Sequence, residues 1–282
     1  YFMTGLWIWK KNGQNRHIRI SLAYVIMIIL IWIPMARRKS LAFLDVGQGD
    51  CFVADTKSGA IIFDGGSSSE DQVGRYRILP YMKYLGYQKI QIAVISHMDI
   101  DHYSGIKELL EMGKIKYLGL PEIPKDETMK KIIGIAKKRG TTIFYLSRGR
   151  QITTKDGSLK VLHPQKNSQM EKNAASLVMQ GKILGYRVLL TGDVEKEGEE
   201  ELLSEELERA DILKAAHHGS KNSTSNEFLQ KVQPKQTVIS CGKQNRYGHP
   251  HLETIHRLQT YRTKIYRTDR SGAIIFFKRR DG

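Results

Sequence analysis

The chain has 282 residues, of which 40% are hydrophobic and only two are cysteines. This length allows one large domain or two small ones with a substantial core, and so few cysteines exclude the dense disulfide framework of a small secreted domain. With 45 lysines and arginines against 29 aspartates and glutamates, the net charge of +16 is compatible with a polyanionic partner such as DNA. Basic charge permits such a partner without demonstrating it, because charged helix faces are often simply solvated.

The first predicted element is an apolar helix at residues 18–36, which carries one charge near its start. Its length approaches the thickness of a bilayer core. A basic triplet at residues 37–39 follows where a signal peptide would have small residues, so a membrane span is favoured over a signal peptide. Because the chain opens on Tyr1 and another apolar run, we predict a fragment of a longer, multi-pass membrane protein. Residues 1–39 are then membrane segments joined by a short basic loop, and residues 40–282 form one large domain.

The domain is predicted to begin with short strands and to continue with alternating helices and strands. The expected strands of the first half lie near 41–46, 51–55, 60–64, 90–95, 115–119 and 142–146, and its helices near 73–85, 104–112 and 126–139. The second half is expected to have strands near 159–162, 176–180, 186–190, 211–216, 264–267 and 272–277, and helices near 194–208, 224–232 and 251–261. Two similar halves with interleaved helices indicate an α/β fold with two sheets face to face and helices outside.

The most informative motif directly follows the predicted strand at 90–95. The run Ser-His-Met-Asp-Ile-Asp-His at residues 96–102 places four side chains able to bind a metal within six residues. Residues two apart in such a loop can face one cation, while the closing Asp-His pair can reach a second. The alternative is an ordinary polar loop, but three distant segments carry companion residues. We therefore predict a site for two metal ions.

The companion segments also follow apolar runs. Asp193 ends a Thr-Gly-Asp run after the strand at 186–190, and His217 and His218 follow the strand at 211–216. His249 lies between a glycine and a proline further on. Candidate ligands therefore follow several predicted strands. Metal sites are commonly assembled from residues at strand ends.

The order His-x-Asp-x-Asp-His, then Thr-Gly-Asp, then a late histidine resembles the metallo-β-lactamase fold. Four runs, at residues 43–50, 173–178, 217–220 and 247–250, make the sequence similar to the C-terminal domain of ComEC-type DNA-uptake channel proteins. The resemblance covers about residues 40 to 280. It implies a four-layer αβ/βα sandwich, preceded here by the transmembrane helix, and a metal-dependent hydrolase domain at 40–282.

The resemblance also implies a role for individual residues. The implied metal ligands are His97 and Asp99 for the first ion, Asp101 and His102 for the second, Asp193 as a bridge, and either His217 or His218 to complete the second site. The sequence does not decide between the two histidines, and the other one is expected to contact substrate. A bridging carboxylate suits two neighbouring cations because it offsets their repulsion.

The surrounding polar residues are expected to support this centre. Asp64 matches an early aspartate that orients the motif loop by hydrogen bonds, and Asp45, Gln48 and Asp50 are expected to shape the adjoining turn. The expected catalytic groups are Asp101, His218 and His249, and the expected substrate contacts are Asn173, Ser176, Ser220, Lys221 and Asn245. Lys214, Lys221, Lys243 and Arg246 are basic candidates for phosphate contacts, while the alternatives for His249 are a metal ligand or a structural turn residue. His163 is a weaker candidate ligand for the first ion.

Asp99 supplies a hard oxygen ligand where many relatives have histidine, which favours manganese, with zinc as the alternative. The expected reaction is phosphodiester hydrolysis by in-line attack of activated water. The resemblance implies that the domain degrades one DNA strand during natural transformation. It would work with an upstream channel domain of the same protein and other DNA-uptake proteins, on the extracytoplasmic face of the bacterial cell membrane.

Three alternatives remain for the activity. The domain could be a phosphodiesterase for a substrate other than nucleic acid, or a non-catalytic DNA-binding domain of the channel. A β-lactam hydrolase is disfavoured by Asp99, the membrane segment and the absence of the expected middle histidine. Fold alone does not separate these functions.

Overall fold

The structure, a computed structural model, describes residues 16–32, 38–170 and 173–279. It divides into two units, Tyr1–Arg38 and Lys39–Gly282. The first contains helix α2 (Arg16–Trp32), so the last four residues of the predicted span at 18–36 lie outside the described residues. Among the residues described, no helix combines the length and the apolar character needed to cross a membrane.

The first sheet of the larger unit has seven strands in the order β14-β1-β2-β3-β4-β5-β6. Their bounds are β1 (Ser40–Phe43), β2 (Phe52–Thr56), β3 (Gly59–Phe63), β4 (Ile90–Val94), β5 (Ile115–Pro121), β6 (Thr142–Leu146) and β14 (Ile274–Phe277). Strands β14 to β3 pair antiparallel, whereas β3 to β6 pair parallel. Parallel neighbours need crossover connections, and helices supply those that follow β3, β4 and β5.

The second sheet repeats this plan with the strand order β13-β12-β11-β10-β9-β8-β7. Its bounds are β7 (Gln151–Thr154), β8 (Gly157–His163), β9 (Val178–Ile183), β10 (Tyr186–Leu190), β11 (Ile212–Lys214), β12 (Gln236–Ile239) and β13 (Lys264–Arg267). Strands β7 to β10 are antiparallel and β10 to β13 are parallel. Both sheets are therefore mixed.

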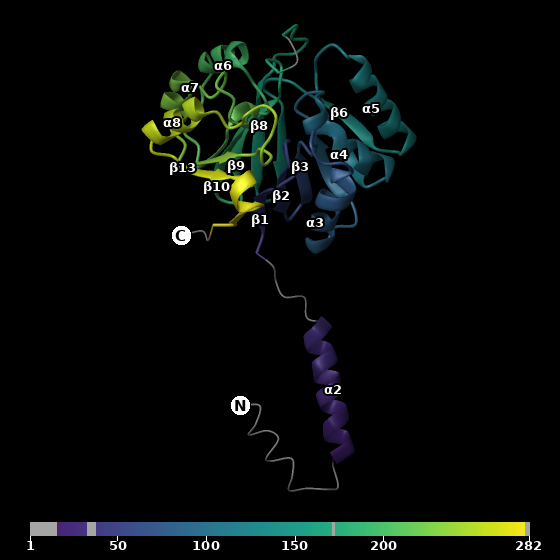
Figure 1. The fold of residues 1–282 in the computed structure, drawn as a ribbon. Coiled ribbons are helices and arrows are strands. Elements are labelled where there is room, and N and C mark those ends of the chain that lie inside the picture. The colour runs from purple at the N-terminus through teal and green to yellow at the C-terminus, as the bar shows by residue number, and fades with distance from the viewer. Residues whose placement is uncertain (1–15, 33–37, 171–172, 280–282) are drawn as a thin grey trace. The chain divides into compact units, whose positions relative to one another are not determined.

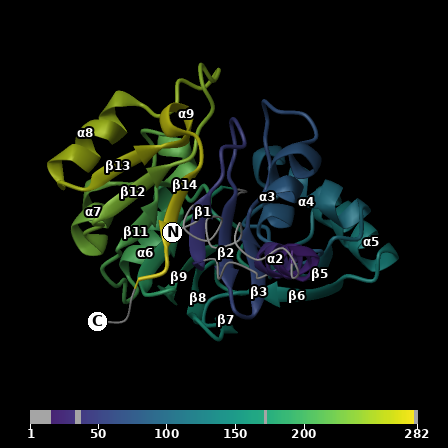
Figure 2. The same ribbon diagram turned by 90° about the horizontal axis from the view of Figure 1, so that it is seen from below.

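Helices cover the outer face of each sheet. On the first sheet they are the π-helix η2 (Gly74–Ile78) with α3 (Leu79–Tyr84), α4 (Ile100–Glu111) and α5 (Glu127–Lys138), and on the second α6 (Lys196–Leu203), α7 (Asn226–Val232) and α8 (Leu252–Thr260). The 3-10 helix η3 (Ala216–Gly219) follows β11, and the short α9 (Thr268–Ser271) connects β13 to β14. Figure 1 shows α3, α4 and α5 beside the first sheet and α6, α7 and α8 beside the second, and Figure 2 shows the strands between these two groups.

Three apolar clusters hold the layers together. One packs the first sheet on α3 to α5, a second fills the space between the sheets, and a third packs the second sheet on α6 to α8. In the central cluster, Phe43 and Phe276 of the first sheet lie with Met179 and Val188 of the second. This confirms the predicted arrangement of two sheets face to face with flanking helices.

Two strands were not among the predicted elements. β7 reads Gln-Ile-Thr-Thr and buries only Ile152, because it is an edge strand with little apolar signal. β12 is only four residues long, with three of them buried. The predicted strand at 211–216 ends at Lys214, since residues 216–219 turn into η3.

Candidate metal centre

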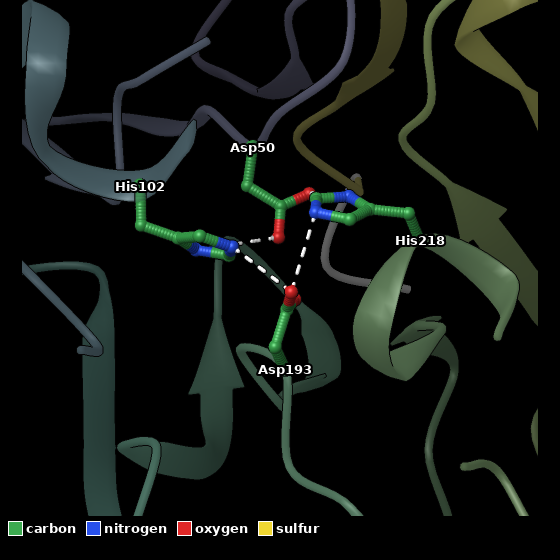
Figure 3. A group of neighbouring side chains, drawn as sticks. All are labelled: Asp50, His102, Asp193 and His218. Carbon is green, nitrogen blue, oxygen red and sulfur yellow. Dashed lines mark ion pairs between the residues drawn. The ribbon is translucent and has the colours of Figure 1, made fainter. Parts of the chain in front are cut away.

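The candidate metal centre is built from loops that follow strands of both sheets. His97 and Asp99 lie between β4 and α4, Asp101 and His102 lie in the first turn of α4, and Asp193 follows β10. His218 lies in η3 after β11. Figure 3 shows His102, Asp193 and His218 converging with Asp50 from the β1–β2 loop, and ligand atoms of these four residues lie within 4.8 Å of one another.

The Nε2 atoms of His102 and His218 face Asp193 in this centre, and the ring of His97 lies against that of His102, with centroids 4.1 Å apart. His97, His102 and His218 are all buried, and their Nε2 atoms have no hydrogen-bond partner among the described residues. A buried ring nitrogen without a partner is costly, and binding a cation removes that cost. The three histidines therefore fit a metal site.

The Nδ1 atoms of the same rings face protein acceptors. His102 Nδ1 donates to Asp64 Oδ2 at 2.9 Å, and His218 Nδ1 donates to the Ser240 carbonyl at 2.9 Å. These bonds keep a proton on Nδ1, so Nε2 is the ring nitrogen that would bind a metal once its own proton is released. Asp64 also accepts from the backbone N–H of Ser96 at 2.7 Å, so this one carboxylate contacts both the start of the motif loop and His102.

Carboxylates lie on the Nε2 side of the rings. Asp193 Oδ2 is 3.2 Å from His102 Nε2 and 3.3 Å from His218 Nε2, which places this carboxylate between the two rings. Asp101 Oδ2 is 3.3 Å from His218 Nε2, and Asp99 Oδ2 is 3.7 Å from His97 Nε2. The mixed nitrogen and oxygen donors suit manganese or zinc.

The charges in the centre shift its pKa values strongly. Burial alone lowers the pKa of His218, but the carboxylates of Asp193 and Asp50 outweigh it and raise that pKa to about 10. His102 has its pKa raised well above the usual value, because Asp193 and Asp64 likewise overcome its burial. Burial raises the pKa of Asp101, but the neighbouring histidines bring it down to about 2. The metal-free centre therefore holds protons on histidine and none on Asp101 at neutral pH.

The two adjacent histidines have different surroundings. His218 is buried in the centre, whereas the side chain of His217 is 23% exposed at its edge. His217 Nδ1 lies 2.9 Å from Glu195 Oε1, and His217 Nε2 lies 3.8 Å from Asp193 Oδ2. The geometry brings His218 to the predicted ligands, whereas His217 lies at their edge and pairs with Glu195.

His249 lies against His217, with ring centroids 5.4 Å apart. Its loop is held by Asn245, whose side chain accepts from the His249 N–H at 3.0 Å and donates to the His249 carbonyl at 2.6 Å. Burial and the neighbouring histidines lower the pKa of His249 to about 4. Its imidazole is therefore neutral at physiological pH.

The other predicted contact residues differ in exposure. Ser176 is fully buried and accepts from the Asp193 N–H at 3.3 Å, and Ser220 is buried and accepts from the backbone of Asn222 at 3.3 Å. Asn173 is partly exposed in the loop before Ser176, while Lys221 is exposed. Of the five predicted substrate contacts, Lys221 is exposed and Asn173 and Asn245 are partly exposed, whereas Ser176 and Ser220 are buried.

His163 lies in a separate hydrogen-bond arrangement. Its Nε2 donates to the Ala174 carbonyl at 2.7 Å, and its Nδ1 lies 2.9 Å from Glu201 Oε2. Both ring nitrogens therefore face protein partners, and the geometry favours a structural role over metal binding.

Asp50 is the residue whose place the sequence did not predict. It lies on the Nδ1 side of the histidines, with oxygens 3.6 Å from His218 Nδ1 and 3.7 Å from His102 Nδ1. Its backbone N–H also donates to the Asp101 carbonyl at 3.0 Å, so it shapes the turn as expected. The Gly-Gln-Gly run before it indicated only a turn, and nothing in its spacing pointed to the histidines.

Two hollows are lined by residues of the loops around the centre, but by none of the candidate ligands. One, of about 670 Å³, has charged side chains of both signs: Glu195, Glu199, Glu200 and Glu227 with Lys196, Lys221 and Arg257. A smaller one, of about 210 Å³, is lined by Lys243, Arg246 and their neighbours. The larger hollow is therefore of mixed charge, and the smaller one carries only basic charged side chains.

The fold and the ligand set define a class of metal-binding protein. The family model described as the metallo-beta-lactamase superfamily matches residues 44–243, so the chain belongs to this superfamily. The "metallo-beta-lactamase fold protein YhfI" of Bacillus subtilis has a TM-score of 0.57 at 12% identity, covering 84% of this chain and 99% of its own. At that identity the likeness supports the fold alone.

Curated relatives bear the names of competence proteins, which confirms the predicted resemblance. "ComE operon protein 3" of Bacillus subtilis is 35% identical over 92% of this chain and 35% of its own length. "Competence protein ComA" of Neisseria gonorrhoeae is 30% identical over 84% of this chain and 32% of its own. The chain thus spans about a third of the length of these relatives.

Proposed function

We propose that the domain at residues 40–282 hydrolyses phosphodiester bonds of DNA and degrades one strand during natural transformation. The observation that carries this proposal is the convergence of the buried Nε2 atoms of His102 and His218 with the carboxylates of Asp101 and Asp193, at 3.2 to 3.3 Å. The names of the curated relatives support DNA as the polymer, and the net charge of +16 suits a polyanion.

Two divalent ions, manganese or zinc, would supply Lewis-acid stabilisation and activation of water when bound. His97, Asp99, Asp101, His102 and His218 would hold them, with Asp193 between. The neutral imidazole of His249 can donate a hydrogen bond to a phosphate oxygen, because its low pKa keeps a second proton off the ring.

Basic residues at the two hollows would hold the flanking phosphates. Lys221 lines the larger hollow and Lys243 and Arg246 line the smaller one. Such contacts bind any sequence and weaken as the salt concentration rises. His217, partly exposed and paired with Glu195, would contact the substrate.

Cleavage of DNA by the metal-free and metal-loaded domain tests this function. Residues 39–282 have their own cores and would be stripped of metal, then assayed on labelled single- and double-stranded DNA with Mn²⁺, Zn²⁺ or Mg²⁺. Metal-dependent cleavage that is lost in Asp101→Ala and Asp193→Ala, but kept in the exposed control Asp71→Ala, would support it.

Two other outcomes would each indicate a different function. Hydrolysis of bis(p-nitrophenyl) phosphate with intact DNA would indicate a phosphodiesterase for another substrate. Binding of DNA without hydrolysis of either compound would indicate a non-catalytic DNA-binding domain.

We also propose that the apolar sequence at 18–36 anchors the protein in the bacterial cell membrane, with the metal domain on the extracytoplasmic face. Incoming DNA would arrive on that face, beside an upstream channel domain and other DNA-uptake proteins. Protease treatment of spheroplasts that express the full chain would test this placement. Degradation of the domain without lysis would support it, and protection until lysis would contradict it.

A further inference from the structure

A lysine is buried directly behind the candidate metal centre. Lys214, the last residue of β11, and Asp50, from the β1–β2 loop, are each only 4% exposed. The Lys214 ammonium contacts Asp50 Oδ2, donates to the Gly192 carbonyl at 2.7 Å and donates to Asp193 Oδ1 at 3.3 Å. An ammonium has three donors, and these contacts use them all. Lys214 is therefore not the phosphate contact that the sequence suggested.

The contact with Lys214 divides the two oxygens of Asp193 between different partners. Oδ1 faces the ammonium, while Oδ2 faces the Nε2 atoms of His102 and His218. A carboxylate with both oxygens free can bind one cation in a bidentate manner. With Oδ1 held by Lys214, Asp193 presents one oxygen to the centre, which suits a bridge between two cations.

Asp50 makes a lysine tolerable at this position. An unpaired ammonium so close to a metal site would repel the cations it adjoins. Asp50 balances that charge, and its other oxygen lies 3.6 Å from His218 Nδ1. Its backbone N–H also donates to the Asp101 carbonyl at 3.0 Å. The pair thus connects β11 to the segments that carry Asp101 and His218.

We propose that Lys214 and Asp50 are positioning residues that hold Asp193 as a one-oxygen bridge, so that the centre binds two metal ions and not one. The inference rests on the metal centre proposed above. Partners of metal ligands outside the coordination sphere typically change metal affinity by about 10- to 100-fold. We expect Lys214→Met to weaken binding of the second metal ion by that factor.

The experiment titrates the full chain, stripped of metal, with Mn²⁺ and follows binding by calorimetry and by electron paramagnetic resonance. Wild type is expected to bind two ions with an exchange-coupled spectrum. Lys214→Met is expected to bind one ion at the same concentration, with the spectrum of an isolated ion. Lys235→Met, which removes an ammonium 2.8 Å from Asp211, is the matched control and should keep both ions.

The double variant Asp50→Asn/Lys214→Met separates positioning from stability. Removing Lys214 alone leaves a buried charge unpaired, whereas changing both residues removes that cost. A double variant that melts like wild type yet binds only one ion supports the proposal. If Lys214→Met does not fold, the double variant alone tests the proposal. Two coupled ions with wild-type affinities in either folded variant would overturn it. A wild-type chain that binds no Mn²⁺ or Zn²⁺ would instead overturn the metal centre itself.

Discussion

The two sheets deliver their candidate ligands by different local structures. The segment at 96–102 follows β4 and enters α4, so Asp101 and His102 lie in the first turn of a regular helix. The segment at 215–220 follows β11 and turns through two non-glycine residues in the left-handed region, His217 at φ 48° and His218 at φ 52°. That conformation is uncommon for residues with a side chain.

The two segments differ in how their backbone conformation directs successive side chains. At a loop-to-helix junction the directions of successive side chains follow a known periodicity, so several ligands within one short run can converge. Two successive left-handed residues instead separate their side chains sharply. One histidine is buried with its Nε2 beside Asp193, and the other is directed towards Glu195.

Replacing His217 and His218 by alanine, one at a time, is expected to give the largest difference between the two residues. We expect His218→Ala to reduce metal affinity by more than about 100-fold, because a direct ligand should exceed the effect of an outer partner. His217→Ala should keep metal affinity within about twofold and lower the hydrolysis rate by about 10²-fold, as for the loss of a positioned polar group. Calorimetry and the DNA assay measure the two quantities, and equal metal loss in both variants would contradict the asymmetry.

Metal binding by the segment at 96–102 can be weakened without changing a candidate ligand. Asp64 accepts from His102 Nδ1 and from the Ser96 N–H, so Asp64→Asn removes the charge that fixes both. We expect metal affinity to fall by about 10- to 100-fold. Asp45→Asn, a polar change in a nearby turn, is the control and should bind as wild type. An unchanged affinity in Asp64→Asn would show that the loop holds its ligands without this carboxylate.

Both segments should release protons when a metal binds. The pKa of His102 and that of His218 are raised above the usual value in the metal-free protein, so both rings are protonated at neutral pH. A metal must displace the proton from Nε2, and affinity should therefore rise by about tenfold per pH unit for each proton released. Calorimetric titration in buffers with different ionisation heats counts these protons. An affinity that is independent of pH between 6 and 8 would contradict the protonated state.

The sequence was sufficient for the parts of the site that depend on local spacing. The run at 96–102, Asp64 and Asp193 could be recognised because each follows an apolar strand, and the structure brings them together. The sheets could be predicted for the same reason, except for the weakly apolar edge strand β7.

Contacts that depend on distant backbone geometry could not be predicted. The choice between His217 and His218 depends on their positive φ angles. Residues with a side chain rarely adopt such angles, so the residue types at these positions did not predict them. The contact between Asp50 and Lys214 joins residues far apart in sequence, for which the sequence predicted, separately, a turn and a phosphate contact. A buried charged pair leaves no periodic pattern, because its partner is chosen by tertiary packing.

The far end of β11 offers the smallest predicted effect, and it separates stability from metal binding. Asp211 precedes the strand, accepts from the Arg187 N–H at 3.0 Å and pairs with Lys235 at 2.8 Å. Burial raises the pKa of Asp211, but Lys235 and the Arg187 N–H outweigh it and bring the pKa below the usual value. A depressed pKa in the folded state stabilises the fold above the unfolded pKa of about 3.9, and the contribution is lost as pH falls towards the folded pKa.

Asp211→Asn should therefore lower the free energy of unfolding by about 1 kcal/mol at pH 7, since Lys235 is exposed and its pair is screened. The difference from wild type should shrink below about pH 4. Urea unfolding at several pH values measures it, with the exposed Glu206→Gln as control. Metal affinity should stay as in wild type, because Lys214 and His218 lie at the opposite end of β11. A loss of metal affinity in Asp211→Asn would show that the left-handed turn depends on the whole strand and not on its local contacts.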